Sequence, residues 1–204
     1  MPSTTCALDT FESQGTFRVL LDTLARPGRV RTLPTGVPRP PAPAALAVPL
    51  ALADLGQRVA VVGDENGGLI DGVAGRWAAM VRDATSCAIV RIEEADLVVV
   101  LAGAAEADLI ERLRRGSPLA PEQGCRLVLA CDRLVAGSPG AVAVTLRGPG
   151  VPDVAVLGID GIDAEVLAAV ALANTAFPCG IDTWLVSGRG EVAGIPRSTT
   201  LEVR

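Results

Sequence analysis

The hydrophobic positions near the start of the chain repeat with the period of an α-helix. These positions, at i, i+3, i+4 and i+7, are Phe17, Leu20, Leu21 and Leu24. Residues at this spacing share one face of a helix, so the pattern predicts an amphipathic helix that packs against a core. Asp9 or Thr10 can cap its start, and the Pro27-Gly28 pair ends it.

Short apolar runs and further helical segments alternate along the rest of the chain. We expect strands at residues 29–33, 59–62, 88–92, 97–101, 126–130, 141–146, 154–156, 183–187 and 191–195. We expect helices at residues 44–55, 72–82, 104–115 and 164–175. Turns are expected at 64–68 and at 188–190, and a Pro-rich loop at 34–43. This alternation predicts an α/β or α+β fold with a mixed sheet covered by helices.

The helix expected at 104–115 carries its charges in helical order. Acidic residues open it and arginines close it, so the charges complement the helix dipole. Asp108 with Arg112, and Glu111 with Arg115, form i, i+4 pairs in the favourable order. The arginine cluster is therefore interpreted as helix stabilisation, with an anion site as the alternative.

The composition fits one domain with a substantial core. Of the 204 residues, 50% are hydrophobic and 20% are charged, which excludes a disordered chain. The net charge of −5 argues against binding to nucleic acid or anionic membranes, which requires a basic face. Residues 1–10 lack the features of a signal peptide, and the longest apolar stretch, 40–53, contains four prolines and is too short to span a membrane. We expect one soluble, cytoplasmic domain over residues 1–204.

Three residue types are missing, and their absence excludes whole classes of chemistry. The chain has no histidine, no tyrosine and no lysine, so all 18 basic residues are arginines. Without histidine there is no Ser-His-Asp or Cys-His machinery. Without lysine there is no Schiff base to pyridoxal phosphate and no P-loop. Catalysis would depend on carboxylates, cysteine, hydroxyls or arginine.

The five cysteines do not indicate a disulfide framework or a zinc site. Their number is odd, and no C-x-x-C pair occurs. Cys125 and Cys131 stand six positions apart in an apolar run, which places both on one face of a strand. We interpret them as small buried hydrophobes, the alternative being a reactive pair.

Two turns that follow or contain arginine are candidate anion sites. One is a Gly-Pro-Gly turn after a strand, which can present backbone N–H groups beside a guanidinium. The other places an arginine beside three consecutive hydroxyl side chains near the end of the chain. The candidate anion-binding residues are Arg147, Gly148, Gly150, Arg197 and Ser198. The alternatives are an ordinary tight turn and a solvated edge.

Other patterns are weaker. Gly188–Ala193 matches G-x-G-x-x-A, but Pro196 prevents the helix that a dinucleotide site requires, so a hairpin is expected. Asp153, Asp160 and Asp163 form a loose acidic group, in which we expect Asp160 or Asp163 to cap a helix, with a hard-cation site as the alternative. From the residues alone we assign no catalytic residue, no metal ligand and no cofactor-binding residue.

Five segments resemble the PhnH family, a subunit of the bacterial carbon–phosphorus lyase machinery that degrades phosphonates. They are Thr16–Gly28, Gly116–Gly124, Leu146–Val151, Phe177–Asp182 and Ile195–Thr200, the last followed by Glu202-Val203. Their order and spacing fit the family over nearly the whole chain. One departure is Thr200, where members of the family carry a histidine.

The resemblance implies a fold and a partner set. The fold would be a three-layer, helix-covered mixed sheet similar to that of pyridoxal-phosphate-dependent transferases, without the cofactor. The family is dimeric in isolation and acts in a core complex with the PhnG, PhnI and PhnJ subunits. In that complex PhnI, assisted by its partners, replaces the adenine of ATP by a phosphonate, and PhnJ later cleaves the carbon–phosphorus bond.

The resemblance favours an accessory, non-catalytic subunit of this complex. A second hypothesis is a free-standing small transferase that acts on a phosphorylated substrate through Asp182 and the arginines. A third is a dimeric module that binds small anions.

Overall fold

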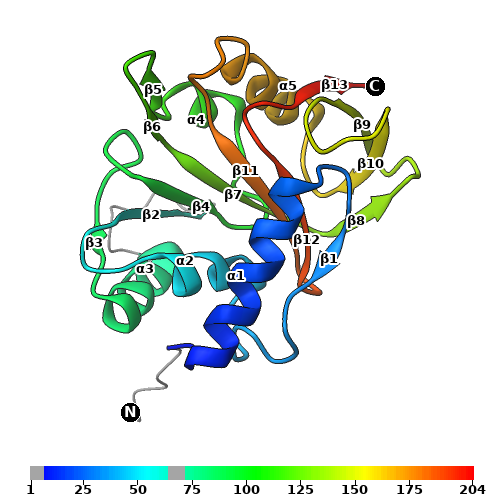
Figure 1. Ribbon diagram of the computed structural model, residues 1–204. Coiled ribbons are helices and arrows are strands. Elements are labelled where there is room, and N and C mark those ends of the chain that lie inside the picture. Colours follow the sequence, from blue (N-terminus) through cyan, green and yellow to red (C-terminus); the bar gives the residue numbers. More distant parts are fainter. Residues whose placement is uncertain (1–6, 64–71) are drawn as a thin grey trace.

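A seven-stranded sheet forms the centre of the fold (Figure 1). Its order is β1 (Arg31–Thr32), β12 (Glu191–Ile195), β11 (Asp182–Ser187), β7 (Arg126–Cys131), β4 (Leu97–Val100), β2 (Arg58–Val62) and β3 (Ala88–Ile89). The strands from β11 to β3 are parallel, whereas β12 and β1 are antiparallel to their neighbours. The expected mixed sheet is therefore confirmed. The computed structural model describes residues 7–63 and 72–204, and the turn expected at 64–68 and the first residues of the segment 1–10 lie outside them.

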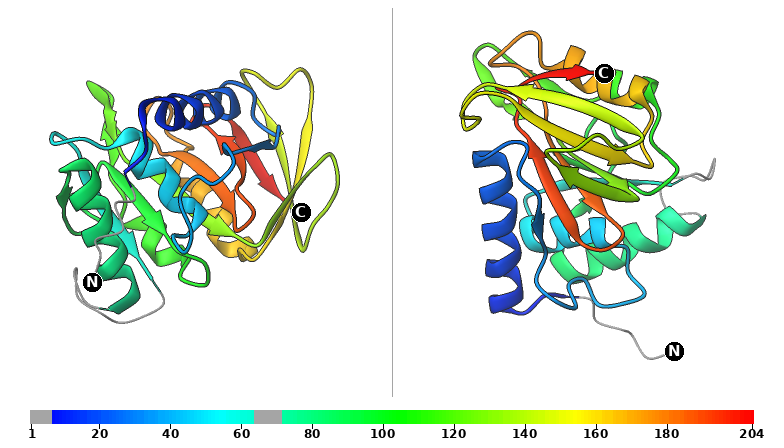
Figure 2. Two further views of the ribbon diagram at one scale, coloured as in Figure 1. Left: turned by 90° about the horizontal axis from the view of Figure 1, so that it is seen from below. Right: turned by 90° about the vertical axis from the view of Figure 1, so that its right-hand side faces the viewer.

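Helices cover both faces of this sheet (Figure 2). On one face lie α1 (Thr10–Ala25), the 3₁₀ turn η1 (Ala44–Leu46), α2 (Ala47–Leu52) and α3 (Gly72–Thr85). On the other face lie α4 (Ala107–Glu111) and α5 (Ala164–Ala173). Each face has its own cluster of buried apolar side chains, so the central sheet separates two cores.

A second, four-stranded sheet packs beside the α5 face. Its order is β13 (Thr200–Val203), β9 (Val142–Arg147), β10 (Ala155–Asp160) and β8 (Arg133–Ala136), all antiparallel. A separate hairpin consists of β5 (Arg115–Ser117) and β6 (Ala120–Gly124). The sequence pattern did not predict β5, β6, β8 or β13, because these strands are only three to five residues long and none carries a long apolar run.

Strand β7 is the central strand and is buried on both sides. Leu127 and Leu129 lie in the core under α4 and α5, and Val128 lies in the opposite core. Cys125 and Cys131 share the face of Leu127, as their spacing predicts. Burial raises the pKa of both thiols to about 12, which leaves them protonated at neutral pH. Their interpretation as buried hydrophobes is confirmed.

Helix α1 begins as predicted but buries a different face. Asp9 is the N-cap, and its carboxylate accepts a hydrogen bond from the Glu12 N–H at 2.8 Å, within a full capping box. The buried side chains are Thr16, Leu20 and Thr23, whereas Phe17 and Leu21 are 48% and 56% exposed. The expectation that Phe17 and Leu21 face the core is wrong.

The close approach of α1 to β12 explains this difference. A Cβ on Gly194 would lie 2.6 Å from the Thr23 carbonyl carbon, so only small side chains fit between the two backbones. The hydroxyls of Thr16 and Thr23 donate to the helix's own carbonyls, at 2.8 and 2.9 Å, which satisfies them without water.

The helix expected at 104–115 is wrong in length, since α4 covers only Ala107–Glu111. The predicted i, i+4 pairs do not form. Arg112 instead pairs with Glu93, and Arg114 pairs with Asp96, both from the segment before β4. Arg115 is the first residue of β5. Pairing with these distant residues is incompatible with a helix that continues to residue 115, so α4 ends at Glu111. A local sequence pattern does not reveal such tertiary partners.

Candidate functional site

Three of the five segments that carry the family resemblance meet around Arg197. Its backbone N–H donates to Asp182 Oδ1 at 2.9 Å, and its Nε and Nη2 donate to Asp182 Oδ2 at 3.1 and 2.7 Å. Its Nη1 donates to the carbonyl of Pro121 at 2.6 Å. A Cβ on Gly124 would collide with the carbonyl of Gly180. We call Arg197, Asp182, Pro121, Gly124 and Gly180 the Arg197 cluster, which joins three of the five segments.

The other two segments meet at the Gly-Pro-Gly turn between β9 and β10. A Cβ on Gly148 would lie 2.9 Å from the carbonyl oxygen of Ser198, and one on Gly150 would collide with the carbonyl of Ala25 at the end of α1. Both glycines have positive φ, at 132° and 83°. The turn is therefore wedged between α1 and the segment before β13, and glycine is required there for space as well as for conformation.

The structure brings only part of the predicted anion site together. Arg147 is exposed at the end of β9, opposite Thr200 of β13, and Gly148 lies against Ser198. The Arg197 guanidinium instead points into the Arg197 cluster, where Asp182 and Pro121 occupy its donors. Arg147 makes no ion pair with any described residue.

A row of alternating charges runs along the amino ends of the parallel strands. Arg58 opens β2, Asp96 precedes β4, Arg126 opens β7 and Asp182 opens β11. Asp96 accepts bonds from Arg58 Nη2 at 2.7 Å and from Arg114 Nη1 at 2.9 Å. Arg58, Asp96, Arg114 and Arg126 line a polar cavity of about 430 Å³. The sequence did not reveal this cavity, since only the sheet order places its residues together.

The charges of this row set the protonation of Asp96. Burial by itself raises the pKa of this carboxyl group, but hydrogen bonds from the Arg58 side chain and backbone outweigh that effect. The pKa of Asp96 therefore lies below its ordinary value, and the group is ionised at neutral pH.

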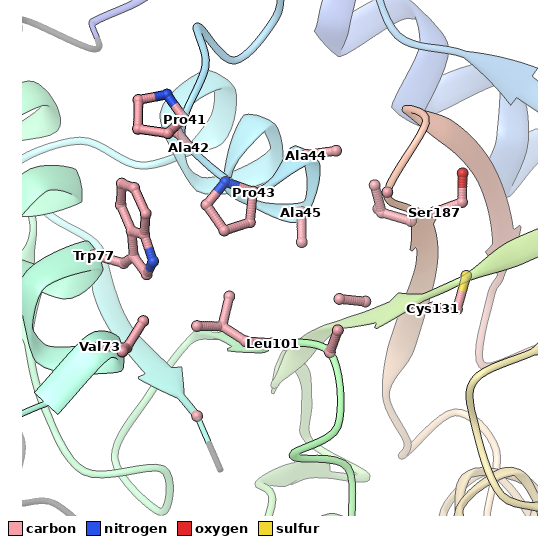
Figure 3. Close-up of a pocket in the computed structure, with 15 residues that line it drawn as sticks. Pro41, Ala42, Pro43, Ala44, Ala45, Val73, Trp77, Leu101, Cys131 and Ser187 are labelled. Atoms are coloured by element: carbon pink, nitrogen blue, oxygen red, sulfur yellow. The ribbon is translucent and has the colours of Figure 1, made fainter. Parts of the chain in front are cut away.

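A second cavity, of about 470 Å³, opens at the opposite edge, where the parallel strands end. Its floor comes from the residues that end or follow β2, β4, β7 and β11, and its other walls come from the loop before η1 and from α3. The lining residues are Pro41, Ala42, Pro43, Ala44, Ala45, Gly63, Val73, Trp77, Leu101, Ala102, Ala130, Cys131, Val186, Ser187 and Gly188 (Figure 3). We call it the carboxyl-edge pocket. The sequence analysis discussed Cys131 and Gly188 for other reasons but did not bring the lining residues together, although Trp77 lies on a correctly predicted helix.

The acidic group at 153–163 does not form a cation site. Asp160 accepts hydrogen bonds from the Ala141 N–H at 2.6 Å and from Arg133 Nε at 2.9 Å. Both bonds lower the pKa of Asp160, and the bond from Ala141 has the larger effect. Asp163 occupies the N-cap position of α5, as expected, although its side chain makes no capping bond. Within residues 7–63 and 72–204, no three metal-ligating side chains gather closely enough to hold an ion.

The hairpin expected at 188–190 is confirmed, with β11 and β12 paired antiparallel across it and Gly190 at a φ of 81°. None of the helices in the described part of the chain has the length and apolar character that a membrane span requires.

Comparison with known proteins gives three findings. The family model described as bacterial phosphonate metabolism protein (PhnH) matches residues 5–202. The α-D-ribose 1-methylphosphonate 5-triphosphate synthase subunit PhnH of Rhizobium meliloti (strain 1021) is 29% identical over 195 residues, which cover 94% of this chain and 91% of that protein. The putative C-P lyase subunit protein HtxG of Stutzerimonas stutzeri is 37% identical over 91 residues, or 45% of this chain and 44% of that protein.

Proposed function

The chain belongs to the PhnH family of bacterial phosphonate metabolism proteins, and from this premise we propose that it is an accessory subunit of a carbon–phosphorus lyase complex. In this role it supports the transfer of a phosphonate to the ribose C1 of ATP, with release of adenine, in the cytoplasm. The observation that carries the proposal is the family match over nearly the whole chain. Two relatives are named as subunits of such machinery.

The chemistry of the described residues supports an accessory role. The carboxylates of Asp96, Asp160 and Asp182 are each bonded to arginine, and the two central thiols are buried with raised pKa values. Arginine itself is a poor proton donor, since it stays charged at working pH. These groups are arranged to stabilise the fold rather than to transfer protons.

We further propose that the three-layer arrangement is that of a pyridoxal-phosphate-dependent transferase without its cofactor. The residues do not fit the cofactor, because a chain without lysine cannot form the Schiff base that holds it. No step of the proposed role passes through pyridoxal phosphate.

The proposed partners are PhnG, PhnI and PhnJ, and exposed apolar side chains mark a surface that would meet them. Leu119 at the β5–β6 turn is 99% exposed, and Phe177 in the loop after α5 is 64% exposed. The two segments are joined by a hydrogen bond from the Gly180 N–H to the Arg115 carbonyl at 2.8 Å. Large apolar groups on adjoining segments are typical of a surface that is covered in an assembly.

Co-purification tests this role. The tagged chain is co-expressed with the other three core subunits of its source, and the product is sized by light scattering. We expect one assembly that contains all four chains, and we expect Leu119→Glu with Phe177→Glu to release this chain from it. Leu55→Glu is the matched control, because Leu55 is 80% exposed in the turn after α2. A wild-type chain that never enters the assembly would overturn the proposal.

For the isolated chain we propose a homodimer formed through the outer face of α1. Phe17 and Leu21 lie one helical turn apart and are exposed there. Phe17→Glu should shift the chain from dimer to monomer in light scattering, whereas Arg18→Glu, one position along the same helix, should leave a dimer. A wild-type chain that is monomeric at every concentration would contradict this.

The anion site stays part of the proposal, centred on Arg147 with the Gly148–Gly150 turn and Ser198. Titration calorimetry with ATP and with methylphosphonate tests it. Arg147→Ala should weaken binding about tenfold, which corresponds to the loss of one charge-assisted contact. Arg189→Ala, at an exposed hairpin turn, is the control. Arg197→Ala reports whether the Arg197 cluster contributes to the site directly or only by holding the adjoining segment in place.

A further inference from the structure

The carboxyl-edge pocket lies where the chain reverses its direction across the sheet. From β2 the chain crosses through α3 to β3 at one edge, and from β4 it crosses through α4 to β7 on the other side. The two crossover helices lie on opposite faces of the sheet. The connections that leave β2 and β4 therefore run to opposite faces of the sheet. Open α/β sheets bind ligands beyond the carboxyl ends of two such neighbouring strands.

The sheet has a notch at this point. Strand β4 pairs with β7 only as far as Val100 and Leu129, so Ala130 and Cys131 continue β7 with β11 as their partner on one side. Ala130, Cys131 and Ala102 line the pocket there. The small side chains on this floor allow a flat group to approach the backbone of the strand ends closely, within reach of peptide hydrogen bonds.

The described residues of the lining carry no charge. Among the described residues that form the pocket, the polar side chains are Ser187, Cys131 and Trp77. The Ser187 hydroxyl is already bonded to Glu191 Oε2 at 2.9 Å and accepts from the Glu191 N–H at 3.1 Å. None of these described lining residues would give a phosphate or carboxylate an ionic partner, which favours an uncharged occupant.

The Trp77 indole supplies a stacking surface. Figure 3 shows the rings of Trp77 and Pro43 on one side of the pocket, with Ser187 and Cys131 across from them. Trp77 is half-buried, and its indole N–H has no hydrogen-bond partner among the described residues. An aromatic face beside an unused donor suits a flat ring that carries acceptor nitrogens or oxygens. The cavity of about 470 Å³ is within the usual range for small-molecule sites.

We infer that the carboxyl-edge pocket binds an uncharged heteroaromatic ring of nucleobase size, stacked on Trp77. This inference rests on the pocket alone and goes beyond the proposed subunit role. The site is distinct from the candidate anion site, because Arg147 and Ser198 belong to the second sheet and the segment before β13, and neither lines the pocket.

The chain offers a direct optical test. It has two tryptophans and no tyrosine, so its fluorescence comes from Trp77 and Trp184 alone. Trp184 is 4% exposed, with its Nε1 bonded to the Leu20 carbonyl at 3.1 Å, and reports on the core. The Trp184→Phe variant isolates Trp77, and Trp77→Phe isolates Trp184. Thermal melting of each variant checks that it folds.

The probes are adenine and adenosine, with cyclohexanol as an uncharged ring that cannot stack. Titration of adenosine should change Trp77 emission saturably in Trp184→Phe and leave Trp184 emission unchanged in Trp77→Phe. By calorimetry, Trp77→Leu should bind adenosine about tenfold more weakly than the wild type, as expected for the loss of one base–aromatic stack. Ala102→Phe, at an exposed position of the lining, should fill the pocket and remove binding without affecting the fold.

Three results would overturn the inference. They are no saturable change of Trp77 emission with either heterocycle, binding to Ala102→Phe as tight as to the wild type, and binding of cyclohexanol as tight as that of adenosine. Because these measurements use the isolated chain, they do not depend on whether it enters the complex, and the two proposals can fail separately.

Discussion

Replacement of Arg197 by alanine tests whether the Arg197 cluster holds the fold together. The change removes three side-chain hydrogen bonds, two to Asp182 and one to the Pro121 carbonyl. The side chains of the pair are only 15% and 25% exposed. The Asp182 carboxylate would keep its hydrogen bond from the backbone N–H of residue 197. It would lose the positive charge that balances it, at a site that is mostly shielded from water.

The magnitude follows from this burial. Breaking a fully buried ion pair costs about 3–5 kcal/mol, and partial exposure reduces that figure, so we expect Arg197→Ala to lower the free energy of unfolding by about 2–4 kcal/mol. For a chain of this size the loss corresponds to a fall in Tm of about 4–16 °C. Arg197→Lys should recover about half of the loss, because an ammonium group cannot reproduce the fork of guanidinium bonds.

Urea unfolding followed by tryptophan fluorescence gives the measurement, with an unchanged m value required for a valid comparison. Arg91→Ala is the control, since the Arg91–Glu94 pair is 68% and 47% exposed, and solvent screening should make its effect on the free energy of unfolding much smaller than that of Arg197→Ala. If Arg197→Ala costs no more than Arg91→Ala, the cluster does not stabilise the fold and the reasoning is refuted.

Three further predictions follow from the described geometry. Gly150→Ala should lower the free energy of unfolding by about 1–3 kcal/mol, because Gly150 has a positive φ and lies against the end of α1. Gly188 has an ordinary φ and open space around it, so Gly188→Ala should change the free energy of unfolding little in the same urea assay. Asp96→Asn should reduce the loss of stability in acid. Because the pKa of Asp96 is lowered in the folded state, its carboxylate stabilises the fold above the ordinary pKa of an aspartate, and this stability is lost as the pH falls through the folded pKa. The dependence of Tm on pH below about pH 4 should therefore be flatter in the variant, and an unchanged profile would contradict the role given to the row of alternating charges. Of the four cysteines in the described part of the chain, Cys179 should react first with a thiol reagent at pH 8, and Cys131 should react only on unfolding, since burial raises the pKa of Cys131 to about 12. Equal rates for the two thiols would contradict the burial of Cys131.

The sequence was sufficient to predict the elements whose patterns are local. The N-cap of α1, the apolar strands of the parallel sheet and the hairpin at 188–190 all follow from neighbouring residues. The length of α4 could not be predicted, because Arg112 and Arg114 find their partners in a segment 18 or 19 residues away. The buried face of α1 was also missed, since threonines that bond their own helix look polar in the sequence.

The same distinction holds for the sites. The turns at Arg147 and at Arg197 were found by composition, but only the sheet register shows that one guanidinium is exposed and the other is engaged. The row of alternating charges and the carboxyl-edge pocket combine residues from strands far apart in the chain, so they depend on the strand order. Trp77 was visible as a rare residue on a helix, and that signal was not used.

The contacts within the Arg197 cluster have a consequence for how this chain can be altered. Three loops meet where Gly124 faces Gly180 and where Arg197 reaches both Asp182 and Pro121. A side chain introduced at one of these glycines is accommodated only if the opposing loop changes as well, so substitutions here should show strong epistasis. A loop transplanted singly from a homologue would meet unmatched neighbours, whereas the three loops moved together form an exchangeable unit.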